Sequence, residues 1–163
     1  MSNELFKFMI KLFLISICVF LCTQFYSQVY TIGSPTHATS SSGLGAINTL
    51  YEDSRVQYIY TPSELTAAGV PSDFPIESVH ILIYELPGVS MDNFTISLKN
   101  TSTNSYNGFP IYDNELTTVY NTASIDPSAF ARDEWSEFDL QSSFTWDGTS
   151  NLLVQLCYDN PNG

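Results

Sequence analysis

The chain has 163 residues, of which 17 are acidic and 5 are basic, so its formal net charge at pH 7 is −12. This excess of carboxylates excludes nucleic acid as a natural partner, because the phosphate backbone would be repelled, and it disfavours anionic membrane surfaces. Hydrophobic residues make up 44% of the chain and aromatic residues 14%, which is enough to build a sizeable core.

Residues 1–28 have the layout of a secretory signal peptide. Lys7 and Lys11 precede the uncharged run LFLISICVFLC, and the polar stretch TQFYSQ follows it. The apolar run is shorter than the roughly 20 residues that a membrane-spanning helix needs. We therefore predict cleavage after Gln28, a secreted or cell-surface location, and no membrane insertion after signal cleavage.

The remaining chain, residues 29–163, has the length of one domain. Cys18 and Cys22 follow Ile17 and Leu21 rather than the small residue of a lipoprotein signal, so we do not expect a lipid anchor. After cleavage Cys157 is the one cysteine left, and an intramolecular disulfide cannot form. We predict that Cys157 is a buried, unpaired thiol and that stability comes from the apolar core.

The composition of this part predicts an all-β protein. It is rich in aromatic residues, while Ser, Thr and Asn concentrate between the apolar segments, as in residues 31–45 before the first full strand. Six segments have the pattern of complete strands and two shorter ones that of partial strands. In chain order these are Val29–Ile32 (partial), 55–60, 76–84, 94–99, 116–121, 135–140, Phe144–Trp146 (partial) and 151–158.

Alternation within the strands predicts how they are covered. Apolar and polar residues alternate in 55–60 and in 94–99, which indicates a sheet with one buried face. Segment 76–84 is apolar on nearly both faces, so we predict a central strand there. The one helical signal is SELTAAG, with Ser63 as N-cap and Gly69 as the terminating residue.

Together these elements predict a β-sandwich of jelly-roll or immunoglobulin-like kind, and we favour the jelly roll. A jelly roll normally has eight strands, and the last predicted strand, 151–158, is followed by only a few residues. We therefore expect the sandwich to be incomplete at the C-terminus, with a sheet edge unpaired. Such an unpaired edge invites aggregation, so we interpret the chain as a fragment of a longer surface protein.

We predict that the chain reverses its direction between the last two predicted strands, Phe144–Trp146 and 151–158. Asp147-Gly148 is a strong turn signal, and Gly148 should have a positive φ. Trp146 precedes it and should pack its ring on the sandwich, with the indole N–H bound to a backbone carbonyl or water.

The chain also resembles an N-terminal β-sandwich domain that recurs in secreted, multidomain surface proteins of Bacteroidetes. The most specific pieces are Tyr60-Thr61-Pro62 with Glu64-Leu65 and Ala68-Gly69, and the run from Trp146 to Leu152. The similarity extends over residues 29–160, and family members usually continue beyond the position of Asn160. The resemblance implies an adhesin-like module placed before other domains of the parent protein and a type IX secretion sorting domain. It implies no catalytic residues.

The sequence offers little for catalysis. Its two histidines are His37, in a Ser/Thr-rich stretch, and His80, in the middle of a strand, and no nucleophile elbow or zinc motif is present. Adjacent Asp133 and Glu134 would point to opposite faces of a strand. Glu137 and Asp139 share a face, but we interpret them as the solvated side of an amphipathic strand. We predict that the protein is not an enzyme.

Two functions fit this composition. The first is a structural or adhesive module without an enzymatic site. The second is a carbohydrate-binding module of a polysaccharide-degrading enzyme, with Tyr106, Phe109 and Tyr112 as the ligand-binding platform for an extracellular glycan. The alternative interpretation of these three residues is that they anchor their loop or cover the sheet.

No metal-ligand spacing is present, and we expect no cofactor. Calcium is the one cofactor considered, because four loops are rich in the oxygen ligands that calcium prefers. Asp and Asn are also ordinary turn residues, and we favour that interpretation. The four loops are 91–93, 112–115, 146–151 and 158–162.

Overall fold

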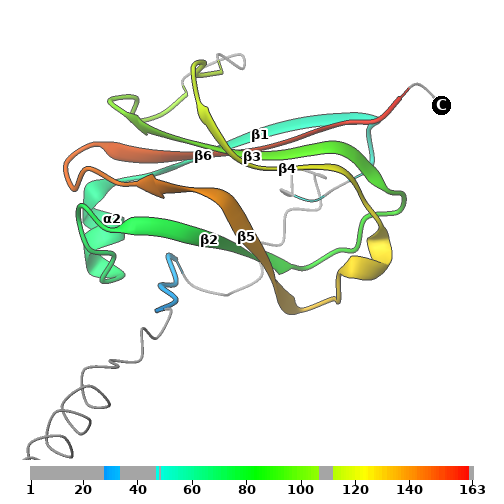
Figure 1. Ribbon diagram of the computed structural model, residues 1–163, viewed down its shortest axis with the longest axis horizontal. Coiled ribbons are helices and arrows are strands. Elements are labelled where there is room, and N and C mark those ends of the chain that lie inside the picture. Colours follow the sequence, from blue (N-terminus) through cyan, green and yellow to red (C-terminus); the bar gives the residue numbers. More distant parts are fainter. Residues whose placement is uncertain (1–27, 34–46, 48, 107–111, 162–163) are drawn as a thin grey trace, which may run out of the picture.

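A computed structural model describes residues 28–33, 47, 49–106 and 112–161. Most of the predicted signal peptide, His37 and Phe109 lie outside the described residues, and the predictions made for them stay predictions. The described part is all-β, with two antiparallel sheets and short helical segments (Figure 1). In chain order the elements are β1 (Asp53–Tyr60), α2 (Pro62–Ala67), β2 (Pro75–Ile83), β3 (Met91–Thr101), β4 (Thr117–Ile125), the 3₁₀ helix η1 (Pro127–Ala129), β5 (Glu134–Thr145) and β6 (Asn151–Asp159).

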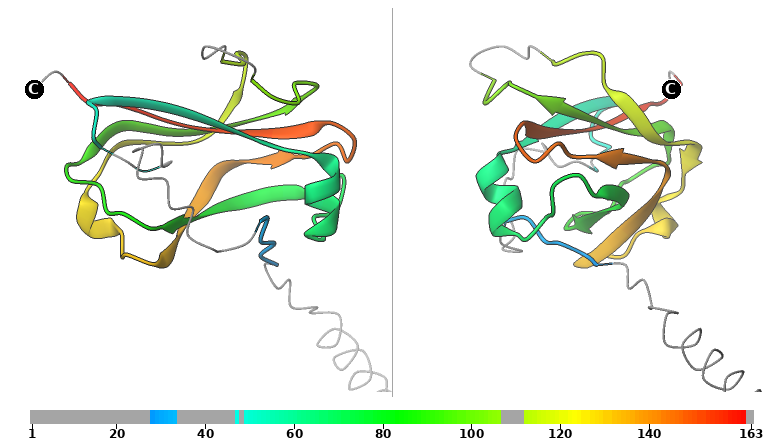
Figure 2. Two further views of the ribbon diagram at one scale, coloured as in Figure 1. Left: turned by 180° about the vertical axis from the view of Figure 1, so that it is seen from behind. Right: turned by 60° about the vertical axis from the view of Figure 1, so that its left-hand side comes forward.

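The strands pair as one long hairpin folded over on itself. β3 pairs with β4, β2 with β5 and β1 with β6, so the pairs are nested around the segment 102–116. β6 also pairs with β3, which gives a four-stranded sheet in the order β1-β6-β3-β4 facing the two-stranded sheet β2-β5. Figure 2 shows the two layers from the back and from one end. This nested arrangement is that of a jelly roll, and it confirms the predicted sandwich.

The prediction that the last strand lacks a neighbour is wrong. β6 lies inside the four-stranded sheet, where Cys157 is opposite Arg55 of β1 on one side and Thr95 of β3 on the other. Nested pairing explains this, because it returns the last strand to a place between the first and the third. The partial strand at Val29–Ile32 is not a strand, and Phe144 continues β5, which is longer than predicted.

The prediction for segment 76–84 is also wrong in part. β2 is a strand, but within the described residues it pairs with β5 alone and is not central. Val79, Ile81 and Ile83 belong to the core, so by alternation His80 and Leu82 lie on the outer face. The apolar composition of β2 thus reflects one buried face and a partly covered outer face.

The core lies between the two sheets. From the larger sheet, β3 contributes Phe94, Ile96 and Leu98, and the inward side chains of β6 add to it. Phe138 of β5 crosses from the other layer and stacks on Phe94 with 5.5 Å between the ring centroids. Tyr120 of β4 meets both of these rings edge-on. Apolar burial and aromatic packing across the layers hold the sandwich together.

One edge of the larger sheet is covered by a side chain. The register of β5 shifts between the pairs of Ile76 and Ser78, and Gln141 lies in the part of β5 that this shift leaves unpaired. The Gln141 side-chain amide accepts from the backbone N–H of Asn121 at 3.2 Å and donates to its carbonyl at 2.7 Å. It takes the place of a neighbouring strand at this point of β4 and protects the edge.

Helix α2 has the predicted position but a different N-cap. Thr61, not Ser63, is the N-cap, because Thr61 and Glu64 form a reciprocal capping box. Gly69 ends the helix as predicted, with a φ of 86°, and the Val70 N–H bonds to the Leu65 carbonyl in a Schellman-type end. The fully buried Leu65 fixes the helix to the core.

Candidate functional site

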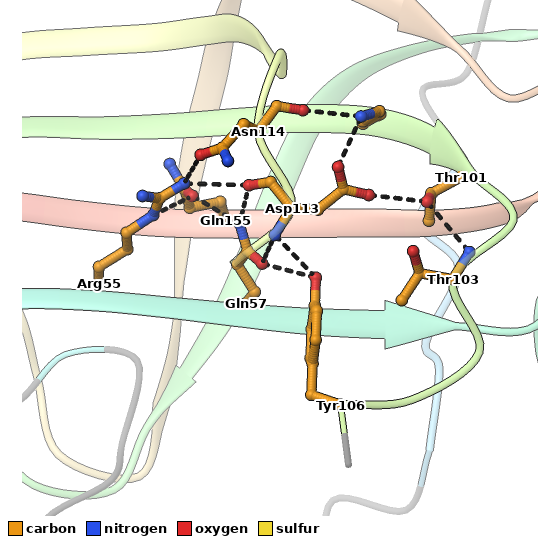
Figure 3. A network of polar contacts seen from close by, with 9 residues as sticks. Arg55, Gln57, Thr101, Thr103, Tyr106, Asp113, Asn114 and Gln155 are labelled. Atoms are coloured by element: carbon orange, nitrogen blue, oxygen red, sulfur yellow. Dashed lines mark hydrogen bonds and ion pairs between the residues drawn. The ribbon is translucent and has the colours of Figure 1, made fainter. Parts of the chain in front are cut away.

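The largest polar cluster of the described residues lies on the outer face of the four-stranded sheet. The registers place Gln57 of β1, Gln155 of β6 and Ser97 of β3 in one row across this face. Residues 102–106 and 112–116, which we call the tip segment, fold back over these strands (Figure 3). Leu153 belongs to the same face and is fully buried, so this part of the face is covered.

Asp113 of the tip segment is the centre of the cluster. Its carboxylate accepts from the Lys99 ammonium at 2.6 Å and from the Thr101 hydroxyl at 2.8 Å. Its backbone N–H donates to Gln57 Oε1 at 3.0 Å, and its carbonyl accepts from Arg55 and from the Gln57 amide. Both side-chain oxygens and both backbone polar groups of Asp113 therefore have partners on strands β1 and β3.

The strand residues of the cluster are also bonded to one another. Gln155 Oε1 accepts from Arg55 Nε at 2.7 Å and from Gln57 Nε2 at 2.8 Å. The guanidinium of Arg55 lies over the Tyr112 ring, 4.6 Å from its centroid. The Tyr106 hydroxyl donates to Gln57 Oε1 at 2.6 Å. The tip segment is thus fastened by aromatic, ionic and amide contacts together.

The electrostatics of Asp113 suit fastening and not catalysis. The hydrogen bond from Lys99 lowers the pKa of Asp113 most, desolvation opposes this, and the Thr101 hydroxyl adds to the lowering. A carboxylate with a lowered pKa and both oxygens occupied is a poor general base. The Lys99–Asp113 pair is mostly covered, with side-chain exposures of 27% and 16%, so water screens it less than it screens a surface pair.

Two of the three residues proposed as a sugar platform serve this network. Tyr106 and Tyr112 are partly buried and contact Gln57 and Arg55, as the loop-anchoring interpretation predicted, while Phe109 lies outside the described residues. The sequence predicted that the aromatic residues of this segment could anchor it. It did not predict Asp113 as the central residue, although Arg55 and Lys99, two of the few basic residues of the chain, each needed an acceptor.

A second polar group lies on the outer face of the smaller sheet. His80 Nε2 is 3.1 Å from the Ser78 hydroxyl and 3.3 Å from a carboxylate oxygen of Glu137. In a nucleophile–base relay the hydroxyl and the carboxylate bind opposite ring nitrogens, whereas both bind the same nitrogen here. His80 is therefore a strand residue with satisfied contacts, as predicted, and Glu137 lies on the exposed side of β5.

In three of the four oxygen-rich loops a side-chain oxygen is bonded within the protein, at Asp113, Asp147 and Asn160. Asp147 Oδ1 accepts from the N–H groups of Thr149 and Ser150 at 2.8 and 2.7 Å. These hydrogen bonds, that from Ser150 most of all, lower the pKa of Asp147 to about 2. Asn160 Oδ1 accepts from the Asp92 N–H. Among the described residues, no group of three or more His, Cys, Asp or Glu side chains is arranged to hold a metal ion.

The prediction of a buried Cys157 is wrong. Cys157 is partly exposed and lies on the outer face of the sheet, in the row of Arg55 and Thr95. Val154, Leu156 and Tyr158 take the core face instead. Partial desolvation still raises the pKa of the thiol, against a smaller opposing effect of Arg55.

The two tryptophans differ in environment. Trp146 is 2% exposed and its indole N–H donates to the Ser150 carbonyl at 2.7 Å, as predicted. Trp135 is 49% exposed on the outer face of β5, opposite Leu82 of β2. Sequence reasoning did not single out Trp135 as a surface residue. The signal was present, because Trp135 has the same strand parity as Glu137, which was assigned to the solvated side.

Comparisons with family models, curated proteins and solved structures found no match. In residues 28–33, 47, 49–106 and 112–161, no helix has the length and hydropathy needed to cross a membrane.

Proposed function

We propose that this chain is a non-enzymatic extracellular or cell-surface β-sandwich module with a structural or adhesive role. The observation that carries the proposal is that the largest polar cluster of the described residues holds the tip segment against the sheet. Its ionisable groups, Arg55, Lys99 and Asp113, are bonded to each other and to backbone groups in ways that fix the tip segment. Groups held in this manner stabilise a scaffold and are not poised for proton transfer.

The sequence supports the extracellular part of the proposal. The Lys-flanked apolar run before Val29 has the layout of an export signal, and the acidic composition keeps an exported protein soluble. The resemblance to the Bacteroidetes family supports a module that acts beside other domains of a parent protein. A carbohydrate-binding module attached to a polysaccharide-degrading enzyme is the alternative, and the exposed Trp135 is the observation that favours it.

Export and the expected lack of hydrolytic activity can be tested with one preparation. The full chain and a Lys7→Glu/Lys11→Glu variant are expressed in a Gram-negative host, and the periplasmic and extracellular fractions are analysed by mass spectrometry. We expect a mature N-terminus at or near Val29 for the natural sequence and strongly reduced export for the variant. Recovery only from the cytoplasm with Met1 intact would contradict the location.

The secreted material is then incubated with neutral polysaccharides, and new reducing ends are measured. We expect none above the level of a heat-denatured sample. Release of reducing ends that co-purifies with the protein would show that the module is an enzyme.

A further inference from the structure

The outer face of the two-stranded sheet carries three successive residue pairs that we call the Trp135 face. Leu82 is opposite Trp135, His80 is opposite Glu137, and Ser78 is opposite Asp139. Alternation places these six side chains on one side of the sheet, since Val79, Ile81 and Phe138 point into the core. Trp135 and Asp139 are four positions apart along β5, which is about 13 Å at a strand rise of about 3.3 Å per residue. The face is therefore long enough for an extended ligand.

Trp135 is the unusual residue of this face. A large aromatic side chain in a strand normally gains most by burial, yet Trp135 is 49% exposed. It lies opposite the partly buried Leu82, so the indole has an apolar neighbour at its side. An exposed indole on a flat, hydrogen-bonded strand pair is a rigid platform that loses little conformational entropy when a ligand stacks on it.

The polar residues beside Trp135 are mainly acceptors. Glu137 and Asp139 are exposed carboxylates, and His80 shares its Nε2 with Ser78 and Glu137. Ionised carboxylates accept hydrogen bonds and cannot donate them, so the matching ligand brings donors such as hydroxyl groups. None of the six residues is Lys or Arg, and two are carboxylates, so charge complementarity disfavours an anionic ligand.

We propose that the Trp135 face binds a neutral glycan chain, with one sugar ring stacked on Trp135 and neighbouring hydroxyls donating to Glu137 and Asp139. A sugar offers an apolar ring face together with hydroxyl donors, which is the combination that this face presents. The inference rests on the proposed extracellular role and gives the adhesive function a ligand class. It moves the glycan site away from Tyr106 and Tyr112, which fasten the tip segment.

A protein partner fits this face less well. The centre of a protein interface is depleted in charged residues, whereas Glu137 and Asp139 are two of the three residues that β5 contributes to this face. A protein surface that covered them without donors would leave buried, unpaired charges, which is costly. A glycan keeps hydrogen bonds to both carboxylates and leaves them partly in water.

The test is affinity electrophoresis of the secreted protein in gels containing xylan, glucomannan, laminarin or mixed-linkage β-glucan. The affinity for each glycan that retards the protein is then measured by calorimetry. We expect retardation by at least one of these neutral glycans. Trp135→Ala should weaken that binding about tenfold or more with an unchanged melting temperature, because the ring is exposed. Trp135→Phe should retain part of the binding. Phe74→Ala, which removes an aromatic ring exposed by 60% elsewhere on the surface, is the matched control and should bind normally.

Three results would overturn the proposal. They are no retardation by any of the four glycans, equal binding by the wild type and Trp135→Ala, and Trp135-dependent binding of a lysine-rich peptide without glycan binding, which would assign the face to a protein partner. None of these results touches the export and reducing-end measurements, so failure of this inference and failure of the proposed function are distinguishable.

Discussion

At the scale of single residues, the turn between β5 and β6 shows how local chemistry determines the chain path. Asp147 caps the turn by accepting from two backbone N–H groups, and Trp146 anchors it through the bond of its indole to Ser150. Gly148 has a φ of 77°, a conformation that side chains with a Cβ rarely adopt. A Cβ built on Gly148 would also lie 2.5 Å from the Ser72 Cβ.

We therefore expect Gly148→Ala to lower the free energy of unfolding by about 1–3 kcal/mol, through backbone strain and the contact with Ser72. Gly69→Ala is the matched control, because Gly69 has a φ of 86° but its added Cβ would meet only Tyr30 at an ordinary 3.6 Å. Chemical denaturation should show the larger loss for Gly148→Ala, and Ser72→Gly should recover part of it. Equal losses for the two alanine variants would contradict the proposed clash.

The sequence was informative about residues whose roles depend on neighbours in the chain. The positive φ of Gly148 and the indole bond of Trp146 were predicted correctly because turn chemistry is local. The burial of Cys157 was predicted wrongly because β6 is apolar on both faces. Which face meets the core depends on the strands packed beside it, and no local pattern contains that information.

At the scale of elements, the tip segment is held onto the four-stranded sheet by polar contacts. Asp113 connects it to β3 through Lys99 and Thr101 and to β1 through Gln57 and Arg55. These contacts bridge residues far apart in the sequence, so strand periodicity could not predict them. The strands themselves were predicted well, with boundaries off by a few residues, because alternation is a property of each strand alone.

Replacing Asp113 by Asn should loosen the tip segment, because the amide loses the ionic bond to Lys99 and can satisfy only one of two donors. We expect a loss of about 1–3 kcal/mol in the free energy of unfolding and faster hydrogen exchange in 102–106 and 112–116. Asp126→Asn is the matched control, since Asp126 caps η1 and should affect exchange only there. Unchanged exchange in the tip segment of Asp113→Asn would contradict this role.

Asp113→Asn should also change how the stability of the protein depends on pH. The pKa of Asp113 is lowered in the folded protein, so its stabilising effect is complete above the unfolded pKa of about 3.9 and is lost as pH falls through the folded value. Stability of the natural protein should therefore decline below about pH 4, and Asp113→Asn should decline less steeply. Asp147 also has a lowered pKa, so part of the acid sensitivity should remain.

At the scale of the whole molecule, the nested hairpin explains both the compact sandwich and the error about its last strand. The fold class followed from strand count, turn spacing and aromatic composition. Strand order did not, because strands that pair at the start and end of the nested hairpin, such as β1 and β6, are distant in sequence. The order places the tip segment over the outer face of the four-stranded sheet and makes β2 and β5 the opposite layer (Figure 2), and the Trp135 face belongs to that layer.

The most direct test of the account is residue-resolved amide hydrogen exchange along β6 and β1. β6 is paired on both sides, so successive N–H groups such as those of Leu153 and Val154 should both exchange slowly. β1 forms the edge of the four-stranded sheet in the described part of the chain, so slow and fast exchange should alternate along it. Slow exchange throughout β6 with alternation in β1 is the predicted result. Alternating protection along β6 would mean that it is an edge strand, and it would contradict the nested strand order that places the tip segment and the Trp135 face on opposite layers.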